Sequence, residues 1–345
     1  MALQSSGYIS LNDVNVELGN SGTASINMGS ADVRGLFGVA SGAITMADGY
    51  GKSDSVTPTR GVFGGGKFKN EMDYITIATT GNATDFGDLT VVRGQLTGVS
   101  SDTRGVFGGG IVGYDGNNTM DYITTLTASN ATDFGDLTVV RGGPAGCSDG
   151  SRGVFGGGKE STSKNTIDYI TIATTGNATD FGDLNVGRMD MAGVSSEIRG
   201  VMAGGSTLNN AASASNVMDY ITIATTGNAT DFGNLTLARR YPGGCDNGTR
   251  GVFASGTVAA NAPNNTIDYI TIATTGNATD FGNLSTVRRG NPGCSNNVRG
   301  VFGGGRNVEA ADTNVMDYIT IATTGNATDF GNLTVARELL GAVQG

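Results

Sequence analysis

Two charged residue types recur at fixed places in this chain and are the first candidates for chemistry. The phrase DYITIATTGNATDFG opens with an aspartate, and an arginine closes each unit that contains it. Calcium takes roughly six or more oxygen ligands, whereas each unit offers one obvious carboxylate at that end. An enzyme needs one asymmetric site rather than six equal ones. We therefore expect Asp73 and Arg93 to form a structural ion pair across adjacent strands of the same unit.

This pairing is expected in every unit. The aspartates are Asp73, Asp121, Asp168, Asp219, Asp268 and Asp317, and the arginines are Arg93, Arg141, Arg188, Arg239, Arg288 and Arg337.

Other side chains that commonly do chemistry are scarce. The sequence contains no histidine and three cysteines, Cys147, Cys245 and Cys294. These stand where other units carry Val99, Val194 or Val343, which predicts small buried apolar positions rather than redox or metal sites. Without histidine, a metal-ligand cluster or a unique carboxylate pair, we predict no cofactor, no metal, no catalytic residues and a protein that is not an enzyme.

Charge and composition exclude two classes of partner. The formal net charge is −10 and the pI is near 4.5, which argues against nucleic acid because phosphate binding needs a basic face. No apolar run approaches the roughly 20 residues of a membrane helix, so membrane insertion is not expected. The start of the sequence also lacks the pattern of a secretory signal.

The elements that position these residues follow from a long repeat. The fifteen-residue phrase begins at Asp73 and returns unchanged at four places, with a degraded copy at Asp121. A second phrase precedes each copy as RGVFGGG, or as RGVMAGG at Arg199 and RGVFASG at Arg250, and its arginines recur at a spacing of roughly 44 to 51 residues. A period of that length with several strand patterns per unit is typical of propeller blades.

Four strands are expected in each unit. In the second unit they are 96–101, 104–110, 120–127 and 134–141, which we call strands A to D. TTGNAT is predicted to be a tight C-to-D hairpin that needs positive φ. These features resemble the kelch repeat, although Phe86 and its counterparts stand near the place of the kelch tryptophan.

Six units predict an all-β, six-bladed, kelch-like propeller over residues 60–345. The final ELLGAVQG aligns with the strand A that the first unit lacks, so the C-terminal strand should close the ring and remove open sheet edges.

The variable segments of the repeat are the candidate recognition surface. The B-to-C and D-to-A connections should lie on one face, and they differ between units in length and content. Drift in unconstrained loops is the alternative explanation. Amide and aromatic groups suited to sugars occur at Tyr114, Asn117, Asn118, Asn209, Asn210, Tyr241, Asn264 and Asn265.

The first 53 residues form a different module. SGYISLNDVNVELG and SGAITMADGYGKS resemble the N-terminal module of structural proteins from tailed bacteriophages, especially marine and cyanobacterial ones, and such proteins also carry IDYITIATTGNATDFGDL repeats. A small α+β module is expected at 1–53 and a linker at 54–59.

The resemblance implies a tail-associated virion protein, present in multiple copies, with 1–53 docking onto other phage structural proteins. The propeller would contact a host surface glycan or protein. The alternatives are a capsid or neck decoration protein without receptor function, and a tail-borne polysaccharide-degrading enzyme.

Overall fold

The computed structural model describes residue 33, residues 59–208 and residues 211–345. The chain divides into two compact units, Met1–Val56 and Thr57–Gly345. The predicted module at 1–53 lies outside the described residues apart from Val33, so its α+β character and its docking role stay predictions. No helix among the described residues is long and apolar enough to cross a membrane.

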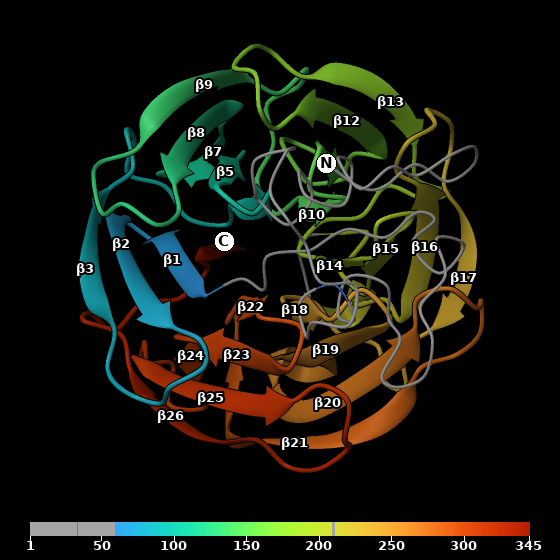
Figure 1. Cartoon of the computed structure of the whole chain (residues 1–345). Helices are drawn as coiled ribbons and strands as arrows, with labels where there is room; N and C mark the ends of the chain where they lie inside the picture. The colour runs from blue at the N-terminus through green and yellow to red at the C-terminus, as the bar shows by residue number, and fades with distance from the viewer. Residues whose placement is uncertain (1–32, 34–58, 209–210) are drawn as a thin grey trace. The chain divides into compact units, whose positions relative to one another are not determined.

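Residues 60–345 form six antiparallel blades around a common centre, each with four strands A to D and one of them with a short fifth strand, which confirms the predicted propeller (Figure 1). In each blade strand A lies nearest the centre and strand D at the rim. In the order A to D, blade 1 is β27 (Gly341–Gln344), β1 (Arg60–Gly66), β2 (Lys69–Thr76) and β3 (Thr84–Asp88); blade 2 is β4 (Thr97–Ser100), β5 (Arg104–Gly108), β8 (Thr119–Thr124) and β9 (Thr132–Asp136); blade 3 is β10 (Ala145–Ser148), β11 (Arg152–Gly156), β12 (Thr166–Thr171) and β13 (Thr179–Asp183).

The second half of the ring repeats the pattern. Blade 4 is β14 (Ala192–Ser195), β15 (Arg199–Ala203), β16 (Val217–Thr222) and β17 (Thr230–Asn234); blade 5 is β18 (Gly243–Asp246), β19 (Arg250–Thr257), β20 (Pro263–Thr271) and β21 (Thr279–Arg289); blade 6 is β22 (Gly293–Ser295), β23 (Arg299–Gly303), β25 (Val315–Thr320) and β26 (Thr328–Asn332). Short additions lie in B-to-C loops: β6 (Ile111–Val112), β7 (Asp115–Gly116), η2 (Ala211–Ser213), η3 (Ala259–Asn261) and β24 (Arg306–Asn307).

The C-terminal strand supplies the innermost strand of the first blade, as predicted. β27 pairs antiparallel with β1, with Val343 opposite Val62. Thr59 and Arg60 donate backbone hydrogen bonds to the carbonyl of Gly345 at 3.0 and 2.9 Å. The two ends of the propeller are therefore joined within one sheet, and β27 covers the edge of β1 that would otherwise be unpaired.

The outer strands and the C-to-D connection differ from the prediction. β9 spans Thr132–Asp136 instead of 134–141, and in most blades the chain leaves the sheet after strand D. TTGNAT is not a tight hairpin, because seven residues separate β2 from β3. The backbone groups of this connection bind a neighbouring blade instead.

The C-to-D segment is a hook on the outer strand of the preceding blade. Gly81 donates to the carbonyl of Phe330 at 2.8 Å, and Ala83 donates to that of Asn332 at 2.8 Å. The Asn332 amide donates in return to Asn82 Oδ1 at 3.0 Å. The same three bonds recur at Gly176, Gly227, Gly276 and Gly325 with the residues that follow them. The copied phrase is therefore an inter-blade connector that covers an exposed sheet edge.

The apolar core lies between blades and accounts for the cysteines. The three cysteines are buried, as predicted, and burial raises the pKa of Cys147 to about 12. A Cβ placed on Gly61 would lie 2.3 Å from Cys294 Sγ, and one on Gly105 would lie 2.5 Å from a Val343 methyl group. Strand B thus needs glycine where the neighbouring strand A presents a small apolar side chain.

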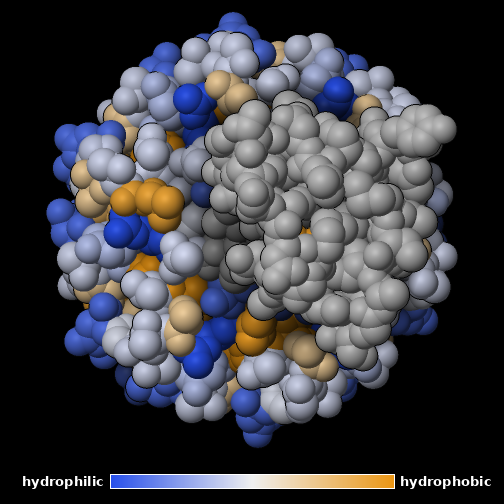
Figure 2. Space-filling view, viewed as in Figure 1, coloured by the Kyte–Doolittle hydropathy of each residue, from blue (hydrophilic) through white to orange (hydrophobic). Residues whose placement is uncertain are grey.

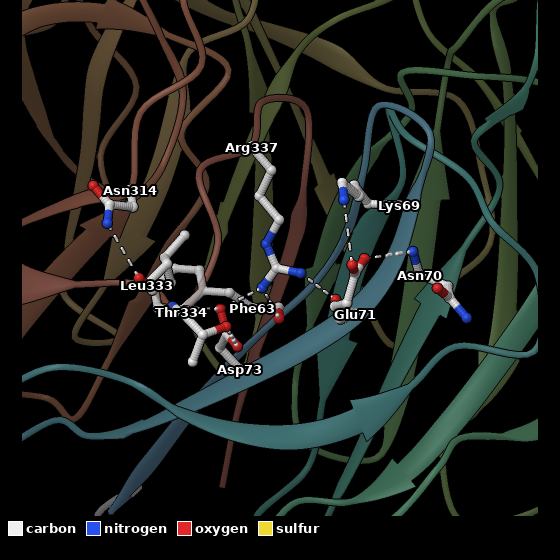
Figure 3. Close-up of polar contacts among 9 residues, drawn as sticks. All are labelled: Phe63, Lys69, Asn70, Glu71, Asp73, Asn314, Leu333, Thr334 and Arg337. Carbon is white, nitrogen blue, oxygen red and sulfur yellow. Dashed lines mark hydrogen bonds and ion pairs between the residues drawn. The ribbon is translucent and has the colours of Figure 1, made fainter.

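The repeated ion pair joins adjacent blades, so the predicted pairing inside one unit was wrong. Arg93 pairs with Asp121 at 3.0 Å, and Arg337 of the last blade pairs with Asp73 of the first at 2.7 Å. In five of the blades the arginine follows strand D, where the chain has left the sheet, and in blade 5 Arg288 lies near the end of β21. The Arg337 guanidinium also donates hydrogen bonds to the backbone carbonyls of Phe63 and Glu71 (Figure 3).

Each of the six carboxylates accepts a further hydrogen bond from a polar side chain of the preceding blade. The hydroxyl of Thr334 donates to Asp73 Oδ1 at 2.5 Å, and its backbone amide donates to Oδ2 at 3.2 Å. Thr90, Thr138, Asn185, Thr236 and Ser285 fill the same place in the other blades. Both partners of each pair are almost fully buried, which fits a structural role because the charges are satisfied internally.

We expect deletion of residues 341–345 to unfold or aggregate the propeller. The deletion removes β27 and with it Val343, which is 2% exposed. Melting temperature and size-exclusion chromatography measure the effect. Unchanged melting of a monomeric truncated protein would contradict closure by this strand.

A matched pair of point variants separates closure from a general effect of added charge. Val343→Asp should lower the stability by about 3 kcal/mol or more, because it buries a carboxylate without a partner. Val298→Asp should stay within about 0.5 kcal/mol, because Val298 is 63% exposed.

Candidate functional site

The variable B-to-C and D-to-A connections meet at one end of the central channel. Isolated bridges join them, such as Gly94 with Ile111 and Arg240 with Thr257. The A-to-B turns and the C-to-D hooks belong to the opposite ends of the strands. Sequence variation and the mouth of the channel therefore coincide.

Of the predicted recognition residues, the two tyrosines line this mouth. Tyr114 lies between β6 and β7 and is 94% exposed. Tyr241 follows strand D of blade 4, and its hydroxyl accepts a hydrogen bond from Gln95 Nε2 at 3.0 Å. Both residues border the same cavity.

The predicted asparagines are engaged in local structure or lie outside the described residues. Asn117 and Asn264 accept hydrogen bonds from the amides two residues ahead, at 2.9 and 3.0 Å. Asn265 donates to the carbonyl of Leu284 at 3.2 Å, and the backbone carbonyl of Asn118 accepts from Leu137. Asn209 and Asn210 are not described.

A ring of six left-handed residues closes the channel below its mouth. Each lies two positions after a buried arginine. Their φ angles fall between 55° and 69°, and the residues are Gln95, Gly143, Asp190, Tyr241, Gly290 and Leu339.

These six residues are joined in a circle of backbone hydrogen bonds. Gly143 donates to Gln95, and each later member donates to the one before it. Gln95 completes the circle by donating to Leu339 at 2.8 Å, and all six N···O distances lie between 2.7 and 3.1 Å. The backbone is six-fold, whereas the side chains differ at every step except the two glycines.

Four members of the ring are not glycine, although left-handed backbone is energetically unfavourable for residues with a side chain. Left-handed backbone suits glycine, which stands at Gly143 and Gly290. Gln95, Asp190, Tyr241 and Leu339 hold this conformation with a side chain, which costs of order 1 kcal/mol each. Such strain concentrates at functional sites.

The ring is the floor of the mouth cavity. Gln95, Tyr241 and Leu339 line this cavity of about 360 Å³ and also a smaller one of about 110 Å³ deeper in the channel. A cavity of the larger size is within the range of small-ligand sites.

Aromatic side chains form part of its wall. Phe68, in the B-to-C loop of blade 1, is 57% exposed, and Tyr114 is more exposed still. Exposed rings of this kind offer flat apolar surfaces with polar edges.

Cationic side chains surround the same cavity. They are Lys67, Lys159, Arg240, Arg289 and Arg306. Arg240 and Arg289 lie 4.8 and 5.6 Å from the centre of the Tyr241 ring.

A buried carboxyl lies beside the floor. Asp190 is 4% exposed and borders the deeper cavity. Burial raises its pKa to about 6, although Arg240, Tyr241 and more distant cations act in the opposite direction.

The opposite end of the channel carries a ring of short polar side chains at the ends of the A strands. Ser195 donates its amide to Asp246 Oδ2 at 2.8 Å, and Ser295 donates to Gln344 Oε1 at 2.8 Å. Asp246 stands where other blades have Ser100, Ser148 or Ser195. Burial raises its pKa to about 6.

Among the described residues, no group of three or more histidines, cysteines, aspartates and glutamates lies close enough to hold a metal ion. The repeated aspartates of the blades are each occupied by an arginine and by further donors.

The sequence analysis did not predict the cations that line the cavity or the ring of left-handed residues. One pattern in the sequence could have indicated these positions: the residue after each glycine pair and the two residues after each terminal arginine vary strongly between units. Asn118 and Asn265, by contrast, occupy a position that is asparagine in all six units, which marks them as structural.

Comparison with known proteins supports the fold class alone. No family model matches the chain, and no curated protein matches it either. Among solved structures, that of the propeller protein YjhT is similar, with a TM-score of 0.66 and 11% identity, over 80% of this chain and 95% of that one. The chain is a six-bladed β-propeller protein.

We expect Asp246→Ser to stabilise the protein at neutral pH but not at acidic pH. The folded-state pKa lies above the unfolded value, so the native state loses stability as pH rises from about 4 to about 6. Removing the carboxyl should recover up to about 3 kcal/mol above pH 6 and almost nothing below pH 4. Denaturant unfolding at both pH values measures this, and an equal effect at both would contradict it.

Proposed function

We propose that this protein is a non-enzymatic, tail-associated virion protein of a tailed bacteriophage. In this proposal residues 1–53 attach it to other virion proteins, and the propeller presents the channel mouth to the host surface. The N-terminal sequence resemblance supports the virion assignment. The form of the mouth supports recognition.

One observation carries the recognition role. The six blades repeat their ion pairs, hooks and backbone ring almost unchanged, yet side chains vary where the B-to-C and D-to-A segments meet. Exposed aromatic side chains collect around a cavity there. A rigid scaffold with one variable face is typical of recognition proteins.

A capsid or neck decoration role is the alternative within the virion, and it needs no such cavity. Figure 2 shows polar side chains around much of the visible rim, with only small separated hydrophobic patches. Electron microscopy of labelled particles distinguishes the locations. Label at the tail supports the proposal, and label only on the capsid contradicts it.

A tail-borne polysaccharide-degrading enzyme is the second alternative, and Asp190 is the observation that favours it. A buried carboxyl with a raised pKa suits a general acid. The test is whether the protein releases reducing ends from host polysaccharide. Release that is lost in Asp190→Gly would contradict the non-enzymatic proposal and support the enzyme. Gly143 and Gly290 at equivalent positions indicate that glycine fits the backbone there.

We expect purified full-length protein to compete with phage particles for adsorption to host cells. The variant Phe68→Ser/Tyr114→Ser should lose at least about tenfold in competition, because both exposed rings border the cavity.

The matched control is Ile198→Ser/Val298→Ser. These side chains are 70% and 63% exposed in A-to-B turns, at the other ends of the strands. Equal competition by both double variants would contradict recognition through the channel mouth.

A further inference from the structure

The mouth cavity is basic although the protein as a whole is acidic. Five cationic side chains line it together with one carboxylate, whereas the chain carries a formal net charge of −10. Cations gathered in a concave site of an otherwise acidic surface raise the local concentration of anions.

Internal ion pairing leaves an excess of positive charge. Glu338 lies 2.9 Å from Arg306, 3.8 Å from Arg289 and 3.9 Å from Lys67, so three cations share one buried carboxylate. The exposed Asp312 is close enough to influence this cluster electrostatically. Arg240, Lys159 and Arg289 are close enough to Asp190 to lower its pKa electrostatically, against the larger effect of burial. Among the described residues, and leaving Arg240 aside, four cations lie around these three carboxylates.

The positions of the cations are variable within the repeat. Lys67, Lys159 and Arg306 each follow a glycine pair, where the other blades have Ile111, Ser206 or Thr257. The scaffold therefore does not require charge there. Their side chains converge only because the blades bring these positions to one end of the channel.

Aromatic rings lie beside the cations. Lys67 Nζ lies 5.6 Å from the ring centre of Phe68, and both border the cavity with Tyr114 and Tyr241. Flat rings pack against the apolar faces of sugars, while ammonium and guanidinium groups form charge-assisted hydrogen bonds with anionic oxygens.

We propose that the mouth cavity binds an acidic saccharide, a sugar that carries a carboxylate, sulfate or phosphate group. The sugar ring packs on Phe68 and Tyr114, and the acid group is held by Lys67, Lys159 and Arg289. This inference rests on the proposed recognition function and names the chemical class of its ligand.

Calorimetric titration of the full-length protein tests the inference. The probes are oligogalacturonate, its methyl ester, a sulfated galactan oligosaccharide, its desulfated form, a phosphorylated oligosaccharide, its dephosphorylated form and inorganic phosphate. We expect at least one acidic oligosaccharide to bind about tenfold or more tightly than its uncharged counterpart, with an affinity that falls as salt rises. The charged probes distinguish carboxylate, sulfate and phosphate.

Two double variants with the same change in net charge locate the site. Lys67→Ser/Lys159→Ser should weaken binding about tenfold or more, because it removes two cavity cations. Lys69→Gln/Lys164→Gln should leave binding unchanged, because these lysines pair with Glu71 and Glu160 outside the cavity.

Three titration results would overturn the inference: equal binding of charged and uncharged saccharides, no binding of any acidic saccharide, or inorganic phosphate binding as tightly as the best oligosaccharide. Equal loss in the two double variants would also overturn it. Tight binding of neutral saccharides would leave the recognition function intact. Failure of the recognition function itself would appear as unimpaired phage adsorption in the presence of the purified protein.

Discussion

The buried ion pair between neighbouring blades is the interaction on which the structure depends. Each arginine leaves the outer strand of one blade, crosses to the next and meets an aspartate there. Burial lowers the pKa of Arg141, and Asp168 acts against that shift. A buried charge without its partner is strongly destabilising, so the stability of each blade depends on the neighbouring blade that supplies the partner. At Arg337 and Asp73 the same rule joins the last blade to the first.

Repetition of this contact divides the molecule into constrained and variable parts. Strands and hooks occupy positions with the same surroundings in all six blades, so their residues change little, whereas in the hydrogen-bonded ring only the backbone repeats. The first two residues after each arginine are held through their backbone in the ring and its bridges, which leaves their side chains free to differ. Arg240, Tyr241 and Glu338 are such residues, and they border the cavity. The candidate site thus consists of side chains that differ between blades, placed on a backbone that is the same in each blade.

The sequence predicted the number of blades, the order of their strands and the closure of the ring, but not the contacts between neighbouring blades. Blade number, strand order and closure by the C-terminal strand followed from the spacing and from the alignment of ELLGAVQG, and all are confirmed. The partner of Asp73 was wrong because spacing along the chain does not distinguish a neighbour within a blade from one in the adjacent blade. TTGNAT was expected to be a hairpin because its glycine and asparagine suit turns, whereas Asn82 binds the preceding blade. The basic cavity was missed because its lysines and arginines are far apart in sequence.

A double-mutant cycle at the closing pair tests the account most directly. Denaturant unfolding is measured for Arg337→Met, Asp73→Asn, the double variant and the parent protein, with Arg141 and Asp168 as the matched interior pair. Each single variant should lose about 3–5 kcal/mol, and the double variant should lose less than the sum by about 1–3 kcal/mol at both sites. Additive losses at Arg337 and Asp73 would contradict the account, because the two residues would then stabilise the ring independently.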